Sequence, residues 1–99
     1  MTYRPLPYYL TIKESKVEGL GLFAIQAISS NVLLGISHVK NDNFEDGYIR
    51  TPLGGFINHS ESPNCEKIEN NGIVELRTIK KVKKNEELTL RYTLYNTNI

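Results

Sequence analysis

The sequence is poor in the residues that build several common protein classes. Its 99 residues include one cysteine, Cys65, and no tryptophan. A single cysteine excludes an intrachain disulfide and a cysteine-rich zinc site, and it favours a reducing, intracellular setting. We expect no signal peptide, because the opening MTYRPLPYYL lacks an apolar core segment, and no apolar run is long enough to span a membrane.

Strong helix formers are also scarce. Alanine occurs twice, whereas Val, Ile and Thr together occur 22 times and Gly, Pro and Asn 21 times. This balance favours short strands joined by turns. The length fits one domain, residues 1–99, so the sequence predicts a single, mostly β domain.

Charge of one sign does not dominate. Twelve Lys and Arg against eleven Asp and Glu leave a net charge of +1, which argues against a general binder of DNA or anionic membranes. The charges are uneven, however, because residues 41–75 hold seven acidic and two basic side chains. This acidic segment is either a solvated loop or a surface that attracts a basic partner. The basic cluster Lys80–Lys84 is interpreted as the outer face of a hairpin rather than a phosphate site.

Hydrophobic patterning places the strands. Alternation predicts strands over Val74–Ile79 and Glu87–Tyr92, and the Asn71-Gly72 pair between apolar segments predicts a hairpin turn. Further strands are expected at Tyr8–Ile12, Gly21–Ile28 and Val32–Val39. The sequence leaves room for one short helix, around Ser30–Leu34, and Pro52–Gly55 is interpreted as a break between elements.

Two short motifs carry candidate chemistry. Gly19-Leu20-Gly21 is either a turn between strands or a loop whose bare backbone approaches a cofactor; a dinucleotide fingerprint is excluded because strand-like residues follow it. His38 and His59 have no nucleophile or metal-ligand pattern around them, and on residue type alone both are interpreted as structural.

The order of three blocks is more specific than any one motif. Val17–Ala24, Gly55–Asn64 and Asn85–Tyr92, taken in this order, resemble the SET domain. The size resembles the minimal SET proteins of viruses and some bacteria. The resemblance implies a β-clip of small curved sheets with a C-terminal pseudoknot. It also implies methylation of a protein lysine with S-adenosylmethionine as cofactor, giving S-adenosylhomocysteine, with no metal.

The resemblance assigns roles to residues. It implies that Gly19, Leu20, Gly21, Asn58 and His59 bind the cofactor, His59 largely through its backbone, and that Tyr92 is catalytic. Leu94, Tyr95 and, with core packing as an alternative, Tyr48 are candidates to line the lysine channel. A basic protein substrate is expected, in the cytoplasm or, for a viral protein, in the host nucleus.

Several positions depart from the family pattern. Glu61 stands where a cysteine is usual, Arg91 where an aspartate precedes the tyrosine, and Asn85 where a turn glycine is usual. We expect no counterpart of the zinc cluster that follows many SET domains. We therefore expect a second copy of the chain to supply the missing walls, as a homodimer. The alternative is a non-catalytic SET-like binding module that keeps the fold, with or without the cofactor pocket.

Overall fold

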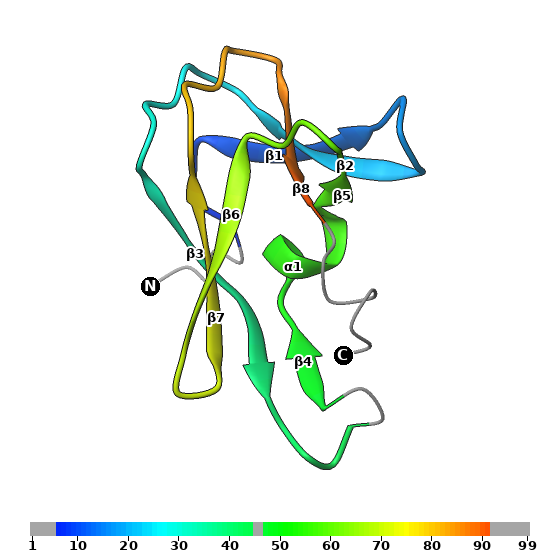
Figure 1. Ribbon diagram of the computed structural model, residues 1–99. Helices are drawn as coiled ribbons and strands as arrows, with labels where there is room; N and C mark the ends of the chain where they lie inside the picture. The colour runs from blue at the N-terminus through cyan, green and yellow to red at the C-terminus, as the bar shows by residue number, and fades with distance from the viewer. Residues whose placement is uncertain (1–5, 45–46, 92–99) are drawn as a thin grey trace.

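A computed structural model describes residues 6–44 and 47–91 of the chain. Its elements are β1 (Leu10–Glu14), β2 (Leu20–Ala24), β3 (Leu33–Lys40), β4 (Tyr48–Arg50), α1 (Pro52–Phe56), β5 (Asn58–His59), β6 (Cys65–Asn70), β7 (Ile73–Thr78) and β8 (Glu87–Leu90). The strands follow the order β1-β2-β8-β6-β7-β3-β4, and β5 pairs with β8. The fold is mostly β, as predicted, and its sheet curves around α1 (Figure 1).

Tight turns with positive φ join neighbouring strands. The β1–β2 hairpin turns at Gly19, where φ is +43° and the carbonyl accepts a 2.8 Å hydrogen bond from the Ser15 amide. The β6–β7 hairpin turns at Asn71 and Gly72, with φ of 54° and 84°. Asparagine and glycine are the residues that adopt such angles at least cost. The predicted Asn-Gly hairpin is therefore confirmed.

The core lies where the alternating strands turn their apolar side chains inward. Val74, Leu76 and Thr78 of β7 are buried, and so are Leu88 and Leu90 of β8. Leu22, Leu53, Leu76 and Leu88, from four different elements, are each no more than 2% exposed. The core therefore joins β2, α1, β7 and β8 into one body.

The only helix of the described residues lies where the sequence predicted a break. Thr51 caps α1 by accepting a 3.4 Å hydrogen bond from the Gly54 amide, and Pro52 occupies the first turn. Proline is well suited to that place, because its missing N–H would have no helical partner there. The predicted helix around Ser30–Leu34 is wrong: the chain turns at Asn31, where φ is +64°, and then enters β3.

Glycine allows α1 to lie directly on the sheet. A β-carbon at Gly54 would come within 2.2 Å of the Ser37 carbonyl oxygen in β3. The Pro-Leu-Gly-Gly segment thus combines a helix start with a close backbone contact, which explains why a residue pattern typical of a turn forms a helix here.

The last described strand, β8, lies inside the sheet, between β2 and β6. It pairs antiparallel with β2 and parallel with β5 and β6. The predicted pseudoknot involves the chain that follows β8, and residues 92–99 lie outside the described ones. Within the described part, no helix is long and apolar enough to cross a membrane.

Candidate active site

The Gly19–Gly21 loop and Asn58 form one cluster. Asn58 opens β5 and is 8% exposed. Its Nδ2 donates to the carbonyl oxygens of Glu18, at 3.1 Å, and Leu20, at 3.2 Å. It also donates to Oε2 of Glu87, at 2.8 Å. The structure therefore brings together four of the predicted cofactor residues, Gly19, Leu20, Gly21 and Asn58, from segments almost 40 positions apart.

A carboxylate lies beneath this loop. A β-carbon at Gly21 would come within 2.2 Å of Glu87 Oε2 and 3.0 Å of Asn58 Nδ2. The Ser15 hydroxyl lies 2.8 and 2.9 Å from the two oxygens of Glu87 and donates to the carboxylate. The same Ser15 oxygen accepts from the Val17 amide at 2.9 Å. A side chain at position 21 would displace the Glu87 carboxylate from its bonds to Ser15 and Asn58.

The surroundings of Asn58 fix which way its amide faces. All three of its partners are hydrogen-bond acceptors, so the nitrogen must face them and the oxygen Oδ1 must face away. No described residue donates to Oδ1, and every fully buried side-chain nitrogen or oxygen of the described residues has a partner. Oδ1 therefore faces away from these three groups and is the atom of Asn58 that can accept a hydrogen bond from a ligand.

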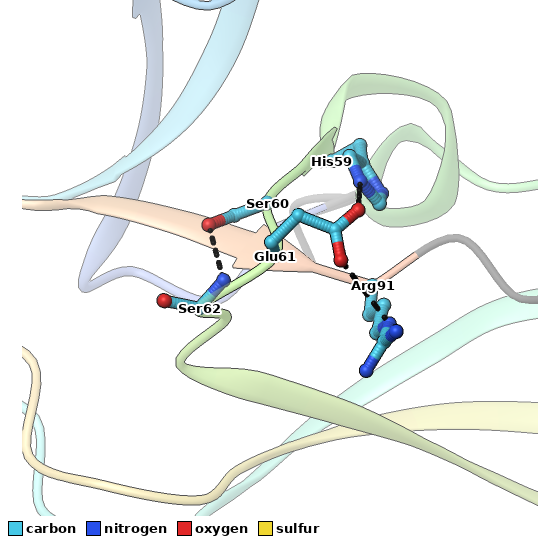
Figure 2. A network of polar contacts seen from close by, with 5 residues as sticks. All are labelled: His59, Ser60, Glu61, Ser62 and Arg91. Carbon is cyan, nitrogen blue, oxygen red and sulfur yellow. Dashed lines mark hydrogen bonds and ion pairs between the residues drawn. The ribbon is translucent and has the colours of Figure 1, made fainter.

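His59 follows Asn58 in β5, and its side chain takes part in a network of charges (Figure 2). Its Nε2 lies 2.8 Å from Oε2 of Glu61, and Oε1 of Glu61 lies 3.5 Å from Nε of Arg91. The hydrogen bond to His59, followed by the charge of Arg91, lowers the pKa of Glu61. Two positions that depart from the family pattern, Glu61 and Arg91, thus contact each other.

The Asn64 side chain is hydrogen-bonded to the backbone of β8. Its Nδ2 donates to the backbone oxygen of Glu87 at 2.9 Å, and its Oδ1 accepts from the Thr89 amide at 2.8 Å. Asn64 is 3% exposed, so the amide side chain pairs with the strand backbone inside the core. A buried backbone group would otherwise need another partner, and this contact therefore fixes where β8 begins.

Tyr48 lies in β4, at the far end of the strand order from β1 and β2. It lines a cavity of about 200 Å³ with four other residues, His38, Lys67, Glu69 and Val74. Its hydroxyl donates to Glu69 at 3.1 Å; partial burial and this carboxylate raise the pKa of Tyr48. Burial likewise lowers the pKa of Lys67. The role of Tyr48 in a lysine channel stays a prediction.

Three predicted site residues, Tyr92, Leu94 and Tyr95, lie outside the described residues. Conversely, sequence reasoning missed two residues of the glycine-loop cluster, Glu87 and Ser15. Glu87 could have been found from its place at the start of an alternating strand, in which Leu88 and Leu90 are buried. No local signal marks Ser15, because its partner lies 72 positions away.

Comparison with known proteins identifies the family of the chain. The model of the SET domain family matches residues 36–93, more than half of the chain. The chain belongs to the SET domain family. The matched region contains β5 and β8 with Asn58 and His59, and the structure adds the Gly19–Gly21 loop that precedes it.

A solved structure shares the fold. The crystal structure of a Plasmodium falciparum "putative histone methyltransferase" is similar with a TM-score of 0.65 and 19% sequence identity. The match covers 85% of this chain and 92% of that one. Among curated proteins, none matches the sequence significantly. At this level of identity the likeness shows the fold and leaves activity to be argued from the site.

Proposed function

We propose that this protein transfers a methyl group from S-adenosylmethionine to a lysine side chain of a protein. The observation that carries the proposal is the contact of Asn58 with the carbonyl oxygens on either side of Gly19, those of Glu18 at 3.1 Å and Leu20 at 3.2 Å. Two motifs that the family resemblance assigns to cofactor binding thus meet at one place in the fold, although they lie far apart in the sequence.

The residues present fit the cofactor. Its amino-acid end carries an ammonium group, which needs acceptors, and Asn58 Oδ1 is an acceptor that faces away from the three groups bound by Nδ2. Leu20, 48% exposed, offers an apolar surface at the same loop. The bare backbone at Gly19, where a β-carbon would meet nothing within 4 Å, leaves room for close approach. These groups would hold and orient the cofactor.

The chemistry demands positioning more than acid–base catalysis. When bound, S-adenosylmethionine supplies a methyl group on a positively charged sulfur, which is a good leaving group. The lysine nitrogen donates its electron pair to that carbon, the carbon–sulfur bond breaks, and the new ammonium can then lose a proton to water. A lysine with a pKa of about 10.4 must first be neutral, which an apolar channel and the nearby sulfonium favour. Alignment can supply about 7–11 kcal/mol of the barrier reduction.

The substrate side of the proposal rests on charge. The acidic segment, residues 41–75, is expected to attract a basic protein region. The homodimer stays a prediction, and the solution mass at micromolar concentration tests it, since a monomer would contradict it.

Calorimetric titration with S-adenosylmethionine and S-adenosylhomocysteine tests the cofactor site. We expect one-to-one saturable binding that Asn58→Ala weakens and that Asn70→Ala, an exposed asparagine in the β6–β7 hairpin, leaves unchanged. A wild-type protein that binds neither compound at millimolar concentration would contradict the proposal.

Labelled methyl transfer to core histones and to ribosomal proteins tests the reaction. Tyr92→Phe should remove most transfer and keep cofactor binding, while Tyr8→Phe, at an exposed tyrosine, should change neither. Cofactor binding without transfer to any basic protein would favour the non-catalytic SET-like module instead.

A further inference from the structure

We infer that Glu61 is a positioning residue that holds the end of β8 in register with the cofactor strand β5. Through Arg91 it would set the place of the next residue, the candidate catalytic Tyr92. The inference rests on the proposed function for its catalytic consequence, whereas its structural part stands on the described residues alone.

The backbone pairing at this point is short. The β5–β8 ladder contains two residue pairs, Asn58 with Thr89 and His59 with Leu90. One further bond follows, from the Ser60 amide to the Leu90 carbonyl oxygen at 3.1 Å. Parallel pairs are slightly less stable per residue than antiparallel ones. The buried side chains of Leu88 and Leu90 set the register of β8, because a slip of one residue would turn them to the opposite face. Few backbone bonds hold the end of β8 to β5, so a side-chain contact there can add to the ladder.

Glu61 contacts both strands with separate oxygens. Oε2 lies 2.8 Å from His59 Nε2 in β5, and Oε1 lies 3.5 Å from Arg91 Nε, directly after β8. The Ser62 amide donates to the Ser60 hydroxyl at 3.0 Å, which turns the chain so that Glu61 lies over the strand ends (Figure 2). The side chain therefore extends the ladder beyond the last backbone bond.

Glu61 and Arg91 both depart from the family pattern, and their opposite charges face each other. Arg91 without Glu61 would lose the carboxylate that faces its guanidinium at the end of β8. Glu61 supplies the opposite charge, and the carboxylate stays ionised because its pKa is lowered. A single exposed ion pair stabilises a fold very little. A small stabilisation is nevertheless enough to position a reacting group, because a misplacement of about 1 Å there can cost about a hundredfold in rate.

Charge reversal with rescue tests the inference. The variants are Glu61→Arg, Arg91→Glu and the exchanged pair carrying both changes. We expect each single variant to lose roughly three- to tenfold in kcat for methyl transfer to core histones, with little change in the S-adenosylhomocysteine affinity. The exchanged pair should recover most of the loss. The advantage of wild type over Glu61→Gln should also shrink at high salt, since exposed charges are screened.

A second ion pair supplies the matched control. Glu66 and Arg77 face each other across β6 and β7, with a 3.0 Å bond from Arg77 Nε and side chains about 40% exposed. The same reversal and exchange there should leave methyl transfer unchanged. Equal losses at the two pairs would overturn a positioning role for Glu61.

Hydrogen exchange of the Ser60 amide separates this inference from the proposed function. That amide bonds Leu90, so it reports the β5–β8 register without any substrate. Single reversals should speed its exchange about threefold or more, and the exchanged pair should restore protection. An unchanged rate in Glu61→Arg overturns the inference, even if the enzyme is active. A wild type that transfers no methyl group contradicts the proposed function, while the Ser60 rate still decides the register.

Discussion

Nδ2 of Asn58 lies 2.8 Å from Oε2 of Glu87, and this contact joins β5 to β8. Both residues also contact the N-terminal hairpin, Asn58 through the Leu20 carbonyl and Glu87 through the Ser15 hydroxyl. Three segments distant in sequence are therefore held by one amide and one carboxylate. Position 58 therefore needs a hydrogen-bond donor, because all three of its partners are acceptors.

Asn58→Asp would replace that donor with a second carboxylate. At neutral pH it should destabilise the fold by about 1–3 kcal/mol, because two acids and two carbonyl oxygens would then face one another. Repulsion raises the folded-state pKa of the introduced acid, so its stability relative to wild type should be best in acid and fall as pH rises through that pKa. Urea unfolding at pH 4 and pH 7 measures both effects.

Two controls accompany this variant. Asn70→Asp, exposed in the hairpin, should cost little at either pH. Adding Glu87→Gln to Asn58→Asp should recover part of the loss, because an amide can donate where the carboxylate could not. A loss at pH 7 that Glu87→Gln leaves untouched would show that the contact does not govern position 58.

Gly21→Ala should push the Glu87 carboxylate out of its place. The new β-carbon would lie 2.2 Å from Oε2, and the carboxylate could move only by giving up its bonds to Ser15 and Asn58. We expect a cost of about 1–3 kcal/mol and weaker cofactor binding. A double-mutant cycle with Glu87→Ala measures the coupling; an additive result would mean that the carboxylate is not the obstacle.

Neighbouring glycines of α1 should respond in opposite directions to alanine. Gly54→Ala would meet the backbone of Ser37 at 2.2 Å and should destabilise by about 3 kcal/mol, because a backbone atom cannot rotate aside. Gly55→Ala meets nothing within 4 Å and should stabilise the helix by about 0.5–1 kcal/mol. Thermal and urea unfolding of the two variants compares them; equal effects would contradict the close packing of α1 on β3.

Cys65 should make stability fall in alkaline solution. Burial raises the pKa of its thiol to about 12, from 9.0 for a free thiol, so only the unfolded chain ionises readily. The contribution of the protonated thiol is complete below pH 9 and is lost between about pH 9 and 12, at up to about 1.4 kcal/mol per pH unit. Cys65→Ala should lower stability at pH 8 but flatten this alkaline slope in urea titrations. Parallel slopes in the two proteins would contradict the burial effect.

Local signals in the sequence were sufficient for the hairpins. The Asn71-Gly72 turn and the alternation over β7 and β8 depend on neighbouring residues, and these predictions are confirmed. The strands at Tyr8–Ile12 and Gly21–Ile28 were placed correctly within a few residues. The helix was not predicted. Pro52–Phe56 is helical because Thr51 caps it and because Gly54 lets it pack closely on β3, and neither feature is visible in a composition typical of turns.

The candidate site also contains residues that the sequence predicted and residues that only the structure reveals. Motif resemblance named the glycine loop and Asn58, and the structure brings them together. It could not name Ser15, whose role arises only when Glu87, 72 positions away, folds beneath the loop. Nor could it foresee that Glu61 and Arg91, noted separately as departures, would contact each other. Such pairs depend on strand order, which no local pattern of this sequence encodes.

The place of β8 has a consequence for the newly made chain. Until residue 90 has left the ribosome, β2 and β6 have no common neighbour, because β8 lies between them in the sheet. The β1–β2 hairpin can contact α1 by then, but the edge of β2 that pairs with β8 has no strand partner yet. Topologies that depend on such distant pairings fold slowly and expose unpaired edges to aggregation. Emergence of β8 from the ribosome is accordingly the step that allows the nascent chain to complete its native sheet.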